Sequence, residues 1–321
     1  RAGNWDACSG YHYNDTTLKG FSHTHLSGTG CIDLGDILFR PTTLKPDLTT
    51  ESIYQPAAFS HKDEDASAGY YSVVLKEEGI KAELTVTAHA GMHRYTFSSG
   101  KEASIIIDLT HLLDNEYIYE AELEQTAANE ITGMRRTRGW TDNQYVYFVA
   151  QFSKPFQTID FIQNKKMVSA GVKLNGTDLQ ACLSFDNSNG EPVIAKVGLS
   201  IVSEKNAREN LETEVIGFDF DAVRSAARSA WEQALSAITV KGGNTDDLKN
   251  FYTAMYHSMV VPNVVSDVNG EYRRHNMEIG QLPKGKVQYS TFSLWDTFRA
   301  WNPLMTLIDT TLAVSYTHLT L

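Results

Sequence analysis

Cysteine is scarce in this 321-residue sequence, and Cys8, Cys31 and Cys182 are odd in number and follow no repeated spacing. This usage excludes a disulfide framework and a cysteine-rich zinc site. Long apolar runs are also missing. No stretch approaches the roughly 20 residues that cross a bilayer, so no membrane span is expected. Residues 1–20 lack the charged start and apolar core of a signal peptide, and because the sequence begins at Arg1, export stays open.

Positive charge is in the minority, with 28 Lys and Arg against 39 Asp and Glu and a formal net charge of −11. Nucleic-acid binding draws its affinity from clustered Lys and Arg, so nucleic acid is excluded as a partner. Apolar residues make up 42% and charged residues 21%, which is typical of a folded protein and not of a disordered one. The length favours two domains, although a single large β domain would also fit.

Short apolar segments separated by turn residues fill the chain from about residue 30 to 200. Runs such as Asn175-Gly176 and residues 187–190 are typical of hairpins. Many strands at this spacing, with no helical pattern between them, predict a large antiparallel β-sandwich of two sheets. The expected strands are Tyr70–Leu75, Ile80–Ala88, Met92–Phe97, Ser104–Leu109, Tyr145–Phe152, Met167–Leu174, Leu179–Phe185 and Pro192–Ile201.

From Asp219 onward the apolar residues recur at helical spacing. One amphipathic helix is expected up to about Ile238, a second over Asp246–Val260, and a third after Ser293. We therefore expect a sandwich domain over residues 1–218, with 203–214 as a linker helix, and a helical region over 219–314. Residues 315–321 break the helical pattern and resemble translated sequencing-adapter sequence, so we expect a non-native tail there.

The densest polar region is GFSHTHLSGTGC, residues 20–31. Its glycines allow close approach of a ligand, and its hydroxyl and imidazole groups offer the mixed donors and acceptors that sugar hydroxyls need. Two alternatives stay open: a polar turn whose histidines bond local backbone, and a zinc site at the two histidines that lacks a third spaced ligand. Gly28-x-Gly30 is not a nucleotide loop. The candidate binding residues are His23, Thr24, His25, Ser27, Gly28, Thr29, Gly30 and Cys31.

A second candidate region surrounds Trp295, Asp296 and Arg299. The indole offers a platform for the apolar face of a sugar ring, and the carboxylate can accept from its hydroxyls. The alternative is structural, because Ser293 followed by Asp296 is a capping box and Arg299 could be the carboxylate's i,i+3 partner. Both roles can coexist. If the two candidate regions form one pocket, they lie close together in space.

Other candidates carry weaker signals. Three aromatics near the start, Trp5, Tyr11 and Tyr13, could add stacking surface or belong to the core. The one basic cluster, residues 133–140, is expected to be an exposed hairpin without function. No carboxyl pair of the kind that glycosidases use is identifiable. Asp33 and Asp36 are expected to be turn or cap groups and are assigned no catalytic role.

Both candidate regions resemble signatures of glycoside hydrolase family 92. Gly20–Cys31, continuing through Asp33-Leu34-Gly35-Asp36 to Phe39, resembles the N-terminal signature of that family. Ser293–Ala300 (SLWDTFRA), followed by Pro303-Leu304, resembles the segment that opens its helical domain. The resemblance covers Tyr11 to about Leu312, and Trp301-Asn302 departs from the Ala-His expected before the proline.

The resemblance implies an N-terminal β-sandwich, linker helices and the truncated start of an (α/α)₆ barrel. It implies an exo-α-mannosidase that inverts configuration, uses Ca²⁺, acts on mannose-containing glycans such as N-glycans, and is periplasmic or extracellular. The catalytic acid, base and calcium ligands would then lie beyond residue 321. No catalytic or metal residue is therefore assigned, and the chain by itself is expected to be inactive.

Two other readings of the sequence stay open. One is a non-catalytic carbohydrate-binding sandwich with a helical appendage, which predicts a concave aromatic face of its own. The other is a different sandwich-plus-barrel carbohydrate enzyme, such as a glucoamylase-like hydrolase or a glycoside phosphorylase. The mannosidic linkage is not readable, because it depends on a leaving-sugar subsite outside this sequence.

Overall fold

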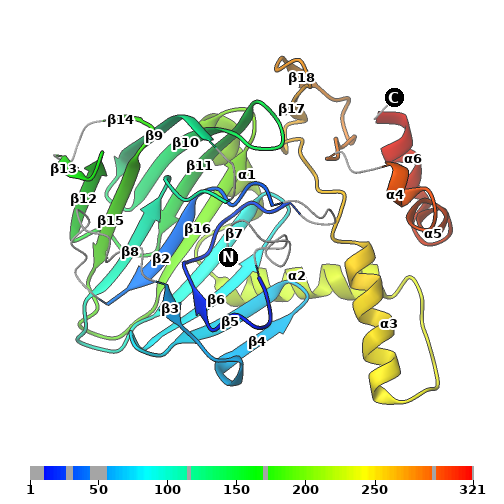
Figure 1. The fold of residues 1–321 in the computed structure, drawn as a ribbon, viewed down its shortest axis with the longest axis horizontal. Coiled ribbons are helices and arrows are strands. Elements are labelled where there is room, and N and C mark those ends of the chain that lie inside the picture. The colour runs from blue at the N-terminus through cyan, green and yellow to red at the C-terminus, as the bar shows by residue number, and fades with distance from the viewer. Residues whose placement is uncertain are drawn as a thin grey trace.

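Two antiparallel β-sheets form the body of the protein (Figure 1). The computed structural model describes residues 11–26, 32–43, 56–113, 117–168, 173–290 and 294–319. The larger sheet has nine strands in the order β14-β9-β10-β11-β16-β7-β6-β5-β4. Their bounds are β4 (Glu64–Ser67), β5 (Tyr70–Leu75), β6 (Ile80–Val86), β7 (Ala90–Thr96), β9 (Tyr117–Ala127), β10 (Glu130–Arg138), β11 (Gln144–Phe152), β14 (Leu174–Gly176) and β16 (Val193–Ser200).

The second sheet has five strands in the order β13-β12-β15-β8-β2. Their bounds are β2 (Leu38–Thr42), β8 (Ala103–Asp108), β12 (Thr158–Gln163), β13 (Lys166–Val168) and β15 (Leu179–Phe185). Two small ladders complete the strands: β1 (Thr17–Leu18) with β3 (Ala57–Ala58), and β17 (Glu271–Arg273) with β18 (Ile279–Gln281). A short 3₁₀ helix, η3 (His61–Asp63), precedes β4. The predicted sandwich is confirmed.

The main core lies between the two sheets, because successive strand side chains point to opposite faces. In β8, Ile105 and Ile107 face this core, whereas Ile106 belongs to a separate cluster with Ile162 and Cys182. Four phenylalanines dominate the fully buried side chains of the core: Phe39, Phe148, Phe152 and Phe161. The five-stranded sheet is therefore apolar on both faces around β8.

A helix covers part of the outer face of the nine-stranded sheet. Ala207 and Leu211 of α1 (Glu204–Glu214) pack against Met92 and Val149. The helix comes so close that a Cβ on Gly198 would lie 2.4 Å from the carbonyl oxygen of Ala207. A side chain at that position would push the helix off the sheet.

The remaining helices follow α1 along the chain. They are α2 (Phe220–Leu235), α3 (Thr245–Ser258), α4 (Leu294–Thr297), α5 (Trp301–Ile308) and α6 (Thr310–Leu319). Ser203, Asp219 and Asn244 each accept a backbone hydrogen bond as N-caps, which explains why α1, α2 and α3 begin where they do. In Figure 1 the helices α4 to α6 stand apart from the sandwich. Within the described ranges, no helix combines the length and apolarity needed to cross a membrane.

Several local expectations were wrong. Asn175-Gly176 lies inside β14, and residues 187–190 connect β15 to β16, so both predicted hairpins instead join strands of different sheets. The predicted third helix is divided into α4 and α5. Residue 315 does not break the helical pattern, because α6 continues to Leu319.

Candidate functional site

The first candidate region is an antiparallel excursion of the chain at one edge of the sandwich. Phe21 exchanges backbone hydrogen bonds with Phe39 at 2.8 and 2.9 Å, and the His25 backbone forms a bridge with Leu34. Residues 21–25 therefore run beside 34–39, and the segment between them closes a loop. The predicted binding residues Ser27, Gly28, Thr29, Gly30 and Cys31 lie outside the described residues.

A buried ion pair holds the base of this loop. The Arg135 Nε donates to Asp36 Oδ1 at 2.8 Å, and both side chains are 0% exposed. Thr24 Oγ1 donates to Asp36 Oδ2 at 2.7 Å and accepts from the Asp36 backbone at 2.9 Å. The same guanidinium also donates to the carbonyl oxygens of Leu109 and His111. One arginine on β10 thus joins the loop, the nine-stranded sheet and the end of β8.

This arrangement corrects two expectations from the sequence. The basic cluster of residues 133–140 is not an exposed hairpin, since Arg135 is the largest fully buried side chain in the described chain. Asp36 is not a turn or cap group but the partner of that arginine. Leu34 and Ile37, on either side of it, have positive φ angles of 70° and 56°. Such backbone is costly for residues with a Cβ, by about 1–2 kcal/mol each, and the buried network offsets that cost.

His23, His93 and Tyr95 form a buried series of hydrogen bonds. The His23 Nδ1 lies 2.7 Å from the carbonyl oxygen of Ile37, so Nδ1 carries the proton and Nε2 is an acceptor. His93 Nε2, 2.9 Å away, must then donate to it, which leaves His93 Nδ1 to accept from the Tyr95 hydroxyl at 2.8 Å. Each donor in this series has one acceptor. The hydrogen bonds therefore specify one tautomer for each imidazole.

Burial keeps these imidazoles neutral. It lowers the pKa of His23 to about 4 and holds the pKa of His93 well below its ordinary value. His25 is exposed, and its Nε2 lies 3.0 Å from the Ser22 hydroxyl. At neutral pH His23 is thus a hydrogen-bonding group without charge. His23 is committed to the interior, whereas His25 and Thr24 lie nearer the loop.

Trp140 is an exposed aromatic side chain that the sequence did not single out as a binding residue. Its backbone N–H donates to Asp33 Oδ2 at 3.2 Å, and Gln144 Nε2 donates to the same oxygen at 2.7 Å. A Cβ on Gly139 would lie 1.9 Å from Asp33 Oδ1, so glycine is required there. Asp33 therefore fixes the β10–β11 turn beside the loop, and the indole, 63% exposed, stays accessible.

The second candidate region is accessible but is not joined to the first by any contact described here. Trp295 is 71% exposed, and the Arg299 guanidinium lies 5.2 Å from the centroid of an indole ring and 5.4 Å from that of Phe298. The arginine thus covers the aromatic platform instead of pairing with Asp296. Ser293 lies outside the described residues, so the capping box is not tested. The proximity of the two regions stays a prediction.

The early aromatics lie elsewhere. Tyr13 stacks on His61 at 4.3 Å, and the Tyr11 hydroxyl donates to Glu64 at 2.8 Å. Both tyrosines are exposed and contact η3 and the first residue of β4, and Trp5 lies outside the described residues. In the described part of the chain, no group of three or more His, Cys, Asp or Glu side chains is placed to hold a metal ion.

Comparison with known proteins gives the following similarities. The glycosyl hydrolase family 92 N-terminal domain matches residues 1–200, and the catalytic domain of the same family matches residues 206–318. The two matches meet between residues 200 and 206, and the seam predicted at residue 219 stays a prediction.

Solved structures and a curated relative agree with these matches. A family GH92 α-mannosidase from Bacteroides thetaiotaomicron is 36% identical, with a TM-score of 0.89 over 95% of this chain and 42% of its own. Its complex with mannoimidazole is 37% identical, with a TM-score of 0.89 over 95% of this chain and 41% of its own. An uncharacterized secreted glycosidase from Arthroderma benhamiae is 30% identical over 92% of this chain and 41% of its own length. The chain thus spans about two fifths of these relatives.

Proposed function

Because the chain belongs to glycoside hydrolase family 92, we propose that it is the N-terminal part of an exo-α-mannosidase that inverts configuration and depends on Ca²⁺. The similarity over 95% of the chain to an α-mannosidase, also solved with mannoimidazole, carries this proposal. The substrate would be a mannose-containing glycan such as an N-glycan. A periplasmic or extracellular location is supported by the relative described as secreted.

The described residues supply binding and positioning groups. Thr24 and His25 stand at the base of the loop, and the remaining hydroxyl groups and glycines of the candidate region lie outside the described residues. The anchors Asp36 and Arg135 hold that base in place, which lowers the cost of ordering Thr24 and His25 when a ligand binds. Trp140 would form an apolar platform at the rim of the same pocket, and Trp295, Asp296 and Arg299 would complete it from the helical region.

We propose that the catalytic acid and base lie outside this chain. Inverting hydrolysis needs a general acid and a general base about 6.5–9.5 Å apart across the scissile bond, and positioning alone does not replace proton transfer. We assign neither role to a residue of this chain. Among the described residues, no group of three or more His, Cys, Asp or Glu side chains is placed to hold a metal ion, and we assign no calcium ligand to this chain.

The test compares two proteins: this chain and a version extended to the length of its relatives. The extended protein should hydrolyse an aryl α-mannoside, lose activity with chelator, and release β-mannose first, as seen by proton NMR. This chain alone should show no turnover. Chelator-sensitive hydrolysis by the 321-residue chain would contradict the assignment of the chemistry. Glycan binding without any turnover by the extended protein would instead favour a non-catalytic carbohydrate-binding sandwich.

A further inference from the structure

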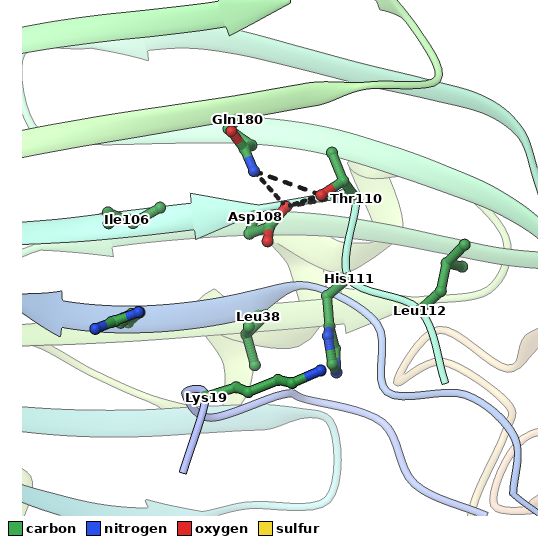
Figure 2. A pocket seen from close by; sticks show the side chains of 9 residues that line it. Lys19, Leu38, Ile106, Asp108, Thr110, His111, Leu112 and Gln180 are labelled. Carbon is green, nitrogen blue, oxygen red and sulfur yellow. Dashed lines mark hydrogen bonds between the residues drawn. The ribbon is translucent and has the colours of Figure 1, made fainter. Parts of the chain in front are cut away.

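A cavity of about 320 Å³ lies on the outer face of the five-stranded sheet, next to the base of the loop described above (Figure 2). Phe39 and Ile107 point into the core from β2 and β8, so the residues next to them point outward to this cavity. It sits where β8 ends and β2 begins. Its lining comprises Lys19, Leu38, Arg40, Ile106, Asp108, Thr110, His111, Leu112 and Gln180.

Asp108 offers this cavity an oriented acceptor. Its Oδ1 receives three hydrogen bonds: from the Thr110 backbone at 2.7 Å, the Thr110 hydroxyl at 2.7 Å and Gln180 Nε2 at 3.1 Å. Figure 2 shows the second oxygen turned away from these donors. The three bonds lock the carboxyl rotamer, and Oδ2 stays available to a hydroxyl of a ligand.

His111 supplies a second polar group from the opposite side. Burial lowers its pKa to about 4, with Lys19 and Arg135 lowering it further and Asp108 and Asp36 opposing them. The imidazole is therefore neutral at pH 7 and presents one donor and one acceptor. In Figure 2 its ring lies beside the amino group of Lys19, which adds further donors.

The charges of the lining nearly cancel. Arg40 pairs with Glu78 at 3.6 Å, outside the cavity. Lys19 and Asp108 contribute one charge of each sign, and the imidazole contributes none. A phosphate or carboxylate would face the Asp108 carboxylate, and a cation would face the Lys19 ammonium. A neutral ligand avoids both of these like-charge contacts.

The rest of the lining is apolar. Leu38, Ile106 and Leu112 provide a surface for C–H groups among the polar residues. The volume falls at the small end of the range of ligand pockets, about 300–1,000 Å³. A pyranose ring has this size and combines an apolar face with hydroxyls around its edge.

We propose that this cavity is a second, non-catalytic site for a neutral monosaccharide unit, with Asp108 and His111 bonding its hydroxyls. None of its lining residues is among the candidate binding residues of the loop, so this inference does not depend on the proposed function. The site would allow the sandwich to hold a second sugar of a branched glycan or of a glycan-coated surface.

The experiment titrates the 321-residue chain with methyl α-D-mannopyranoside, and separately with inorganic phosphate, by calorimetry and saturation-transfer NMR. The sugar should bind, and His111→Ala and Asp108→Asn should each weaken it about tenfold, as expected for a lost hydrogen bond to a partly buried ligand. His257→Ala is the matched control, because His257 is an exposed imidazole on α3. Trp140→Ala separates the two sites, because sugar held by the loop should be lost in that variant whereas binding at this cavity should be retained.

Three results would overturn the inference. They are no sugar binding by the unsubstituted chain, binding of phosphate alone, and loss of sugar binding in Trp140→Ala with retention in His111→Ala. The last result would place the sugar in the loop pocket instead. If His111→Ala or Asp108→Asn fails to fold, Lys19→Ala gives the answer, since its exposed side chain can be removed without disturbing the core. It should weaken binding about threefold at an unchanged melting temperature.

Discussion

Asp36→Asn tests whether the buried ion pair holds the base of the loop. The substitution keeps the shape of the side chain and a partner for Thr24, but it leaves the Arg135 charge buried without a counter-charge. Both side chains are 0% exposed and their atoms are 2.8 Å apart, so water cannot replace the lost carboxylate. Removing one member of such a pair costs about 3–5 kcal/mol. Since 1 kcal/mol shifts the melting temperature of a domain of this size by roughly 2–4 °C, we expect a drop of roughly 6–20 °C by circular dichroism.

Arg138→Ala provides the matched control on the same strand. Arg138 pairs with Asp142 at 3.5 Å, but their side chains are 59% and 85% exposed. Solvent screening reduces that pair to at most about 0.5 kcal/mol, so its melting temperature should hardly change. Asp36→Leu combined with Arg135→Met removes both charges and should recover part of the loss. If Asp36→Asn melts no lower than Arg138→Ala, the pair does not anchor the loop and the reasoning fails.

Three further predictions concern protonation and binding. Burial lowers the pKa of His23 from 6.5 to about 4, so the neutral imidazole stabilises the fold fully above pH 6.5. Between pH 6.5 and pH 4 the free energy of unfolding should fall by about 3 kcal/mol. Urea unfolding between pH 4 and 7 should show this fall, and His23→Gln should reduce it. In the extended protein, Trp140→Ala should lower kcat/KM about fivefold at an unchanged melting temperature, because an exposed stacking surface of roughly 1 kcal/mol is lost. Asp296→Asn should cost several kcal/mol in kcat/KM with the fold intact, and near-normal kinetics would assign that residue to a helix cap.

Most of the fold could be predicted where local pattern and burial agree. Tyr70–Leu75 and Leu179–Phe185 have the predicted bounds because their apolar residues pack into a core. The long β9 and β10 were not among the predicted strands. The outward face of β9 carries Glu120, Glu122 and Glu124, and glutamate is depleted in strands, although Ala121 and Leu123 alternate with these residues. Its pairing with β10 and β14 stabilises it instead.

Local sequence also does not say which sheet a turn will serve. Asn-Gly pairs favour a reversal of the chain through their backbone preferences, but those preferences are the same within one sheet and between two. The chain around residues 175–178 and 187–190 passes from one sheet to the other. Packing of the two sheets, not the turn residues, decided that route.

The sequence by itself determined the features that depend on near neighbours. Strand and helix periods, and the caps at Ser203, Asp219 and Asn244, need only residues a few positions away. The tertiary structure alone decided that a basic cluster buries Arg135 against Asp36, 99 residues away, and that Asp33 positions Trp140 beside the loop. Charge in a sequence marks exposed residues by default, because burying an unpaired ion is costly. Only the packed sheets supply the partner that reverses this expectation.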